Sequence, residues 1–426
     1  MRGIWEFVQR GFVKQVGTTL FTQLAKLILL VANSAIIARW LGPEGKGIVA
    51  LALLVPGMLG LFLSGGIGVA NVYFVGSRRL DASTLVANSL GFAIPTVVLG
   101  FAIVSVMAIT GLLESMVPGV SLNLLLLAML GFPLNLLNGY FSTILQGLQR
   151  IIILNVLSLV QGALVLMLTF LLVVVFPLGV PGALLAQLGA HAVNIVMLGL
   201  VLRREGGVFT PRWDLPIMRS TLSFALRGHI GNVLQFFNYR LDMFLVNYFL
   251  NPAEVGIYTV SARLAELMWN LPNAVSFVIF PKAAASKAET MNVFTPKVFR
   301  VTLGLTTLGA LGLAILGRPL ILLVYSSEFI SAYTPMLALL PGVVLLGGAK
   351  VLTNEIAGRG YPHYNSITSG IALILTVIFD LLFIPRYGIL GASIASSIAY
   401  SVIFGISVRF YLTISRKVDS VCVEGY

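Results

Sequence analysis

Charged residues are scarce in this chain. Of its 426 residues, 10% are Asp, Glu, Lys or Arg, whereas a typical soluble domain has about 25%. Hydrophobic residues make up 58% of the sequence, and apolar runs long enough to span a bilayer recur along it. This composition excludes an ordinary soluble protein and indicates a polytopic helical membrane protein. A transmembrane β-barrel would instead show short segments of alternating polarity.

Cysteine and histidine are also rare. The single cysteine, Cys422, excludes an intramolecular disulfide framework and a metal site built from cysteines. The three histidines (His191, His229 and His363) lie in different apolar segments, without metal-ligand spacing. Neither G-x-S-x-G nor H-E-x-x-H occurs. We therefore expect a protein that is not an enzyme and that has no metal site and no cofactor.

The apolar runs predict twelve transmembrane helices. Their ranges are 18–38, 48–76, 83–113, 122–146, 151–176, 181–202, 221–250, 253–281, 294–317, 332–357, 363–384 and 388–412. Proline occurs inside several of these spans and marks candidate hinges, at Pro56, Pro95, Pro133, Pro272 and Pro341. An even number of spans places both termini on the same side of the membrane.

The distribution of basic residues predicts which side of the membrane the termini occupy. Of the 27 lysines and arginines, most fall in the loops on the side of the termini. The loops of the opposite side contain only Arg39, Lys46, Arg318 and Arg386. Because basic residues concentrate in cytoplasmic loops, we expect both termini in the cytoplasm. The same bias accounts for the net charge of +12 without nucleic acid as a partner.

The two halves of the chain repeat one another. Gly179, Gly182, Ala183 and Ala186 recur as Gly388, Gly391, Ala392 and Ala395, each about 209 residues later. Leu41, Pro43, Gly47 and Ile48 recur at the same spacing as Leu250, Pro252, Gly256 and Ile257. Because each half contains an even number of spans, both halves insert the same way round. The expected fold is all-α, with two six-helix bundles related by a pseudo-two-fold axis along the membrane normal.

This repeat also sets the expected domain organisation. Residues 1–205 form an N-terminal six-helix bundle, and residues 221–426 form a C-terminal six-helix bundle with a cytoplasmic tail. A short basic linker, residues 206–220, joins the bundles on the cytoplasmic side. The loops are all short, so no extramembrane domain is expected to carry an activity.

Four charged side chains lie within predicted spans seven and eight: Arg240, Asp242, Arg263 and Glu266. Each would cost about 2.5 to 3.5 kcal/mol on a lipid-facing helix surface, so they are expected to face protein or water. In span eight, Arg263, Glu266, Asn270 and Asn273 recur every three or four residues and share one helix face. Gln235, Tyr239 and Asp242 do the same in span seven. The two stripes predict one wall of an aqueous cavity.

Other intramembrane polar residues extend this candidate site. Lys26 and Asn33 lie in span one, and Lys350 lies in span ten. An alternative for Lys26 is a structural ion pair with an acid of span seven or eight. Arg263 and Glu266, three residues apart, are placed to neutralise each other. Asp380 is either a proton or sodium coupling site or an interfacial carboxylate near Arg386.

Several segments resemble the polysaccharide transporter family, which includes O-antigen and oligosaccharide-lipid flippases of the multidrug/oligosaccharidyl-lipid/polysaccharide exporter superfamily. The resemblance covers nearly the whole chain. It is carried by Ala38–Gly47, by Arg240-Leu241-Asp242 with Val255-Gly256-Ile257-Tyr258, by Gly358–Tyr364 and by Ile384–Ala392. It implies a MATE-like fold around a cation-lined cavity, in which Lys26, Arg240 and Arg263 match positions where such flippases place charges.

The resemblance implies an alternating-access flippase. Such a protein would move a polyprenyl-pyrophosphate-linked oligosaccharide from the cytoplasmic to the outer leaflet of the cell membrane, for cell-surface polysaccharide biosynthesis. The candidate substrate-binding residues are Lys26, Gln235, Arg240, Arg263, Asn270, Asn273 and Lys350, and the coupling or ion-pair candidates are Asn33, Asp242, Glu266 and Asp380. Expected partners are the lipid-linked glycan, membrane lipids, a proton or sodium counter-ion, and a glycan polymerase or ligase.

Two alternatives stay open. An ion-coupled drug or cation antiporter of the same fold should have a dominant carboxylate in its cavity. The multidrug branch of the superfamily tends to carry an acid in its first span, where this chain offers only Asn33. A membrane glycan polymerase or ligase, the second alternative, should have a large outer loop, and the loops here are short.

Overall fold

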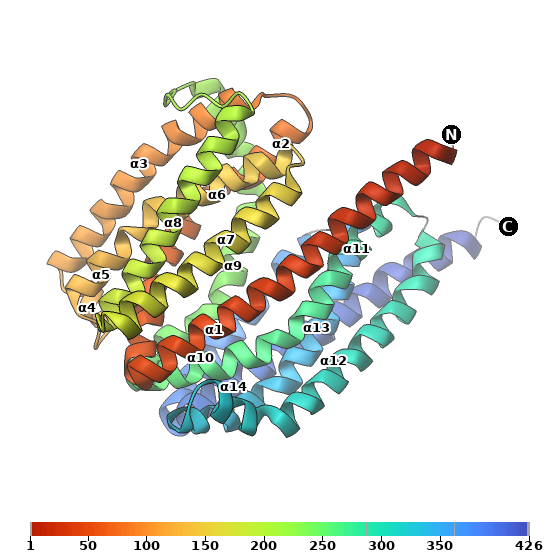
Figure 1. The fold of residues 1–426 in the computed structure, drawn as a ribbon. Coiled ribbons are helices and arrows are strands. Elements are labelled where there is room, and N and C mark those ends of the chain that lie inside the picture. Colours follow the sequence, from red (N-terminus) through yellow and green to blue (C-terminus); the bar gives the residue numbers. More distant parts are fainter. Residues whose placement is uncertain (1, 287, 362, 424–426) are drawn as a thin grey trace. The chain divides into compact units, whose positions relative to one another are not determined.

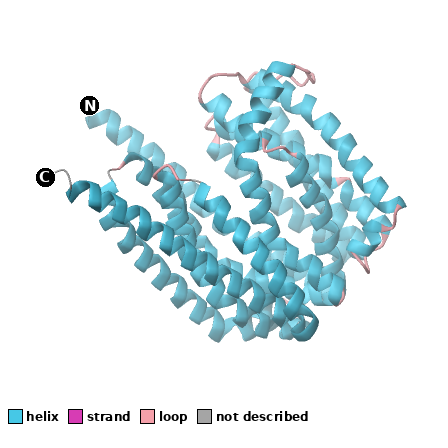
Figure 2. Ribbon diagram, turned by 180° about the vertical axis from the view of Figure 1, so that it is seen from behind, coloured by secondary structure: helices cyan, strands magenta, loops and turns pink. Residues whose placement is uncertain are grey.

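A computed structural model describes residues 2–286, 288–361 and 363–423. Throughout these residues the chain forms helices joined by short turns, and no strand occurs among them (Figures 1 and 2). By its internal contacts the chain divides into two compact units, Met1–His229 and Ile230–Tyr426, here called the N-terminal and C-terminal units. The predicted all-α fold class is confirmed.

The N-terminal unit contains eight α-helices and the start of a ninth. They are α1 (Arg2–Leu63), α2 (Ile67–Gly76), α3 (Ala82–Ile109), α4 (Leu112–Met116), α5 (Leu122–Met129), α6 (Gly131–Gly147), α7 (Ile151–Thr169) with a π-helical extension (Phe170–Val175), α8 (Gly179–Arg204) and the first turns of α9 (Leu215–Phe249). Asp81 caps α3 by accepting a hydrogen bond from the Thr84 amide, 3.1 Å away. The hydrogen bonds from Thr84 lower the pKa of Asp81.

The C-terminal unit contains the remainder of α9 and five further α-helices. They are α10 (Pro252–Glu266), α11 (Asn270–Ala285), α12 (Ala288–Val324), α13 (Tyr333–Gly358) and α14 (His363–Val423), with 3₁₀ turns at Leu267–Trp269 and Ser327–Ala332. Asn251 caps α10 through a 3.0 Å hydrogen bond from the Glu254 amide, and Pro252 follows at the first helical position.

Eight helical stretches among the described residues are long and apolar enough to cross a membrane by themselves. Two of them, Thr22–Leu63 and His363–Ser415, contain a turn at Gly42 or Gly388 and are each long enough to cross twice. The two predicted spans outside this set correspond to α9, which carries polar residues, and to α10 and α11, which are short individually because a 3₁₀ turn separates them. Together these stretches supply helices for all twelve predicted spans.

Proline divides two of the predicted spans. A proline ring clashes with the carbonyl group four residues before it, so it disfavours a continuous helix there. Pro133 opposes the carbonyl of Met129, where α5 ends, and Pro272 opposes that of Met268, inside the 3₁₀ turn between α10 and α11. Both prolines are candidate hinges of the predicted spans 122–146 and 253–281, and the α-helix is interrupted beside each of them.

A third predicted span, 48–76, is also interrupted. Gly65 and Gly66 both adopt positive φ angles, which end α1 at Leu63 and allow α2 to begin at Ile67. The Tyr140 hydroxyl donates a 3.2 Å hydrogen bond to the carbonyl of Ser64 in this break. The break is thus stabilised by α6, from the same unit.

The internal repeat has a structural counterpart at two glycines. Gly179 and Gly388 occupy equivalent positions in the two halves, and both have left-handed φ angles, 64° and 59°. Three residues further on, a Cβ atom at Gly182 would lie 2.7 Å from the carbonyl oxygen of Leu172, and one at Gly391 would collide with that of Phe383. Small residues at these positions allow the backbone to turn back closely on itself in both halves.

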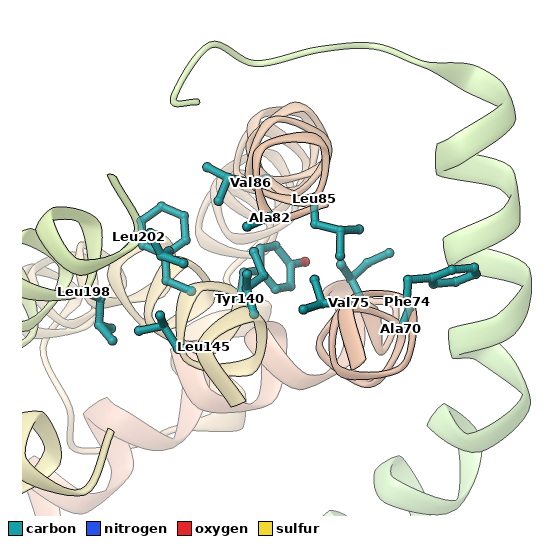
Figure 3. Packing of buried hydrophobic residues seen from close by; sticks show 14 of the residues in the cluster. Ala70, Phe74, Val75, Ala82, Leu85, Val86, Tyr140, Leu145, Leu198 and Leu202 are labelled. Atoms are coloured by element: carbon teal, nitrogen blue, oxygen red, sulfur yellow. The ribbon is translucent and has the colours of Figure 1, made fainter. Parts of the chain in front are cut away.

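Apolar side chains of α2, α3, α6, α8 and α9 form a core cluster of the N-terminal unit, part of which is drawn in Figure 3. They include Phe74 and Val75 of α2, Leu85 of α3, Tyr140 of α6 and Leu198 of α8. In the C-terminal unit the central element is α13, which packs against α10, α11, α12 and α14. Within a membrane such packing is stabilised by close van der Waals contact rather than by removal of surface from water.

Candidate functional site

Two arginines share one carboxylate in the C-terminal unit. Arg240 of α9 places Nη1 2.9 Å from Glu266 Oε1, and Arg263 of α10 places Nη1 3.4 Å from Glu266 Oε2. The side chain of Arg263 is 51% exposed, whereas that of Glu266 is 17% exposed. One acid therefore partly neutralises two cations, and the more loosely held guanidinium is the more accessible one.

Lys350 of α13 is held by aromatic rings and an amide. Its Nζ atom lies 4.2 Å from the centre of the Trp269 ring and 5.6 Å from that of Tyr239, and it donates a 3.1 Å hydrogen bond to Asn273 Oδ1. Cation–π contacts orient an ammonium group without cancelling its charge. Lys350 thus adds a third cation to the cluster of Arg240, Arg263 and Glu266.

The 3₁₀ turn at Leu267–Trp269 positions the polar residues around Lys350. It brings Trp269 against Tyr239, with ring centres 5.0 Å apart, and the Trp269 indole donates a 3.2 Å hydrogen bond to the carbonyl of Val343. The Asn270 amide donates a 2.8 Å hydrogen bond to the carbonyl of Leu267, at the start of the same turn. Asn270 and Asn273 are both exposed.

Gln235 completes this group on α9. Its Nε2 atom donates a 3.1 Å hydrogen bond to the Tyr239 hydroxyl, and its side chain is exposed. The structure therefore brings together six of the seven predicted substrate-binding residues within one unit. We call this group, Gln235, Arg240, Arg263, Asn270, Asn273 and Lys350, the cation cluster.

Asp242 lies apart from the exposed groups of the cation cluster. It is 5% exposed, accepts a hydrogen bond from the Tyr258 hydroxyl and accepts a 2.8 Å hydrogen bond from the Met243 amide. Arg240 and Asp242, two residues apart, point to different partners, as expected for this spacing on a helix. Asp242 is thus a buried acid whose carboxylate is hydrogen-bonded within the protein.

Asp380 of α14 is not an interfacial carboxylate. Its side chain is fully buried, and neither carboxylate oxygen has a hydrogen-bond partner within the described part of the chain. The interfacial interpretation was therefore wrong, because the chain buries this carboxyl group instead of extending it to water. The interpretation of Asp380 as a coupling site stays a prediction.

The N-terminal unit carries the other two candidates on α1. Lys26 is exposed, whereas Asn33 is 8% exposed and its Oδ1 atom has no hydrogen-bond partner among the described residues. Within those residues, no group of three or more His, Cys, Asp or Glu side chains is placed to bind a metal ion.

Sequence reasoning missed Trp269 and Tyr258. Trp269 supports Lys350, and Tyr258 seals Asp242, yet both read as ordinary membrane aromatic residues. A signal for Trp269 was present, because it directly precedes the stretch Asn270-Leu271-Pro272-Asn273, in which polar residues and proline interrupt an apolar span.

Comparison with known proteins identifies the family. A family model described as polysaccharide biosynthesis protein matches residues 36–334, well over half of the chain. The chain belongs to this family. The family resemblance inferred from the sequence is thereby confirmed.

Two relatives of this chain are named as a transporter and a flippase. The chain is 20% identical over 406 residues to the putative O-antigen transporter of Shigella flexneri, covering 91% of this chain and 94% of the relative. It is 23% identical over 201 residues to the probable low-salt glycan biosynthesis flippase Agl15 of Haloferax volcanii, covering 43% of this chain but only 40% of that relative.

Solved structures of similar fold include a lipid flippase and a multidrug transporter. The lipid II flippase MurJ in an inward closed conformation matches with a TM-score of 0.77 and 16% identity, covering 95% of this chain and 90% of MurJ. An inward-facing multidrug resistance MATE family transporter of the MOP superfamily matches with a TM-score of 0.76 and 17% identity, covering 93% and 96%. At these identities the likeness shows the fold, which is the predicted MATE-like one.

Proposed function

We propose that this multi-pass membrane protein is a flippase that moves a polyprenyl-pyrophosphate-linked oligosaccharide from the cytoplasmic to the outer leaflet by alternating access. The observation that carries the proposal is the charge balance of the cation cluster. Arg240, Arg263 and Lys350 stand against the single acid Glu266, and Lys350 is oriented by rings rather than by a carboxylate. A pyrophosphate is attracted to such a surplus of positive charge.

The exposed amides of the cation cluster suit the sugars of this substrate. Gln235, Asn270 and Asn273 offer both hydrogen-bond donors and acceptors beside the cations. Lys26 on α1 supplies a further exposed cation. The names of the relatives, an O-antigen transporter and a glycan flippase, support a lipid-linked glycan as the substrate class. None of the proteins named above is named as an enzyme, which supports transport rather than catalysis.

The proposed location is the cell membrane, with both termini in the cytoplasm. The concentration of lysine and arginine in the loops on the side of the termini supports this orientation. A glycan polymerase or ligase acting on the transported product remains an expected partner, since a flipped lipid-linked glycan needs a further enzyme to extend or transfer it.

Coupling to a proton or to sodium belongs to the same proposal. Asp380 is the best candidate for the coupling group, because an ionised carboxylate that is fully buried without a hydrogen-bond donor is costly unless a cation or proton accompanies it. The same observation favours the antiporter as the second candidate function. An antiporter would exchange a soluble cationic drug for the coupling ion and would leave lipid-linked glycans in place.

The test is flipping in proteoliposomes. A fluorescent lipid-pyrophosphate-glycan is incorporated, and a membrane-impermeant quencher reports its leaflet. We expect Lys26→Ala, Arg263→Ala and Lys350→Met to slow flipping by about tenfold or more, because each removes a charge-assisted contact worth about 1.5 to 3 kcal/mol.

Lys282→Met is the matched control for Lys350→Met. The Lys282 Nζ atom also lies over an aromatic ring, 3.4 Å from the centre of Phe294, but it sits near the end of α11, outside the cation cluster. Equal flipping by wild type and by the variants at Lys26, Arg263 and Lys350 would contradict the proposal. Exchange of a cationic drug without glycan flipping would establish the antiporter instead.

A further inference from the structure

Four polar side chains meet halfway along three helices of the N-terminal unit. Asn138 lies near the middle of α6, Gln161 near the middle of α7, and His191 and Asn194 near the middle of α8. Asn138 and Asn194 are buried, and His191 is partly exposed. Polar groups at this depth of a membrane protein are costly and therefore mark functional positions by default.

Hydrogen bonds fix the orientation of Asn138. Its Oδ1 atom accepts a 2.5 Å hydrogen bond from Asn194, and its Nδ2 atom donates to the carbonyls of Leu134, at 3.0 Å, and His191, at 3.2 Å. Rotating this amide by half a turn would point its Nδ2 donor at the Asn194 donor and its Oδ1 acceptor at the two carbonyl oxygens. The two hydrogens of Nδ2 thus go to carbonyl oxygens, and Nδ2 lies 3.5 Å from the ring atom Nδ1 of His191.

Gln161 presents a hydrogen-bond donor to the same ring atom. Its Nε2 atom lies 3.0 Å from His191 Nδ1. In this arrangement Nδ1 accepts, so the hydrogen of the neutral imidazole sits on Nε2. The neutral ring therefore keeps one basic nitrogen, Nδ1, inside the unit.

Among the described side chains of the helices packed on α8, the only carboxylate is that of Glu44 on α1. The segments α5, α6, α7 and Phe170–Val175 contain no Asp, Glu, Lys or Arg. On α8 the other charged groups are Arg203 and Arg204, in its last turn. The remaining ionisable groups of α6 and of the described side chains of α1 are Tyr140, which bonds to Ser64, Lys46, which bonds to Ser34, and Lys26, Arg39 and Glu44.

We propose that His191 is a proton-binding site and that the proton it gains or loses changes the packing of α7 against α8 and α1. Protonation adds the second hydrogen of the ring, at Nδ1, so the Gln161 amide donor then faces another donor. Asn138 cannot turn over without losing Asn194. Gln161 can rotate to present Oε1, so the change passes to α7.

The packing of α7 carries this change to α1. Gly162, beside Gln161, lies so close to α1 that a Cβ atom there would be 3.1 Å from Leu29 Cδ1. Leu29 follows Lys26 by three residues on the same helix, about one turn away. The π-helical extension of α7, Phe170–Val175, provides a wide turn of the kind that often accommodates such shifts. For transport, the inference rests on the proposed function, because Lys26 is a proposed substrate contact.

The test measures distances inside the N-terminal unit without any lipid substrate. Cysteines replace Gln23 on α1 and Arg203 on α8 in a Cys422→Ser background, and spin labels on them report the separation of the two helices by pulsed electron paramagnetic resonance. Both positions are exposed. Between about pH 5 and pH 8, the range in which histidine changes charge, we expect a reversible shift of a few ångström.

Variants assign this shift to one group. His191→Gln keeps an amide for hydrogen bonding but cannot bind the proton, so it should abolish the shift. His363→Gln, at an exposed histidine, and Asp380→Asn should leave it intact. Gln161→Glu should move the midpoint of the shift upward by about 1 to 3 pH units, because a carboxylate next to imidazole favours the protonated ring.

Each outcome decides the matter. A shift that persists in His191→Gln, or its absence in wild type, overturns the proposal, as does an unchanged midpoint in Gln161→Glu. The last variant keeps the test valid if His191→Gln does not fold. A protein that shows the shift but flips no glycan contradicts the proposed function alone.

Discussion

At the scale of single residues, the ion pairs of the C-terminal unit are of two kinds, one accessible and one buried. Glu266 is divided between Arg240 and Arg263, which leaves Arg263 accessible. Glu355 is instead fully buried and paired with Arg359, itself 6% exposed, four residues later on the chain. It therefore does not extend to the membrane interface. The first arrangement suits ligand binding, and the second suits structural stability.

This difference gives a prediction about stability. Arg359→Ala leaves Glu355 buried without its partner, which should lower the free energy of unfolding by about 3 to 5 kcal/mol. Arg150→Ala is the matched control, because Arg150 pairs with Glu205 at the surface, where the side chains are 49% and 23% exposed, and should cost about 1 kcal/mol or less. Denaturation of the purified variants in detergent compares the two losses, and similar losses would contradict this reading of Glu355.

At the scale of helices, the break between α10 and α11 creates the cation cluster. Pro272 prevents a continuous helix, and the resulting 3₁₀ turn places Trp269 beneath Lys350. The proline is accommodated by Gly347 of α13, where a Cβ atom would lie only 2.8 Å from Pro272 Cγ. The repeat partner of Gly347, Gly139, has open space at the same position. This close contact is therefore specific to the C-terminal unit.

A double-mutant cycle tests the contact between Pro272 and Gly347. Gly347→Ala should destabilise the protein, because its methyl group meets the proline ring. In the Pro272→Ala background the same change should cost less by at least about 0.5 kcal/mol, since the obstructing ring is gone. Gly370→Ala, at a helical glycine with open space around it, controls for helix propensity. Additive effects at Pro272 and Gly347 would show that the two residues do not press on each other.

At the scale of the whole molecule, the proposed topology sets which loops reach each side of the membrane. Counting spans from cytoplasmic termini places Ser77, after α2, inside and Ser115, in α4, outside. Both residues are exposed. In intact cells or right-side-out vesicles, a membrane-impermeant maleimide should label Ser115→Cys but not Ser77→Cys, each in a Cys422→Ser background. Labelling of Ser77→Cys but not of Ser115→Cys would contradict the proposed orientation and indicate the opposite one.

Much of the fold could be predicted because the length of an apolar run, and the glycines and prolines that interrupt it, depend on one segment of the sequence alone. The twelve spans follow from such runs. The turn at Gly42 falls between two predicted spans, and the turn at Gly388 falls at the first residue of the last one. Pro133 and Pro272 were predicted as hinges, but the sequence does not show that a helix ends beside each of them, because a proline within an apolar run can bend a helix as well as divide it.

The candidate site was predicted unevenly for the same reason. Helical spacing placed Arg263, Asn270 and Asn273 on one exposed face, since that depends only on one segment. The support of Lys350 by Trp269, and of Asp242 by Tyr258, depends on how α9, α10 and α13 pack in three dimensions. No spacing along the chain reveals such pairs.

The seventh predicted span begins inside the N-terminal unit, which extends to His229. The linker is bonded there, because the Arg212 amide donates a 3.1 Å hydrogen bond to the carbonyl of Ala87. Thr221 of α9 accepts a 3.4 Å hydrogen bond from Asn88, and the Phe224 ring stacks on Tyr73, with centres 4.4 Å apart. During synthesis, the first six spans therefore lack part of their packing until the ribosome has released the start of α9. Folding of the first half is then complete only after translation of the second half has begun.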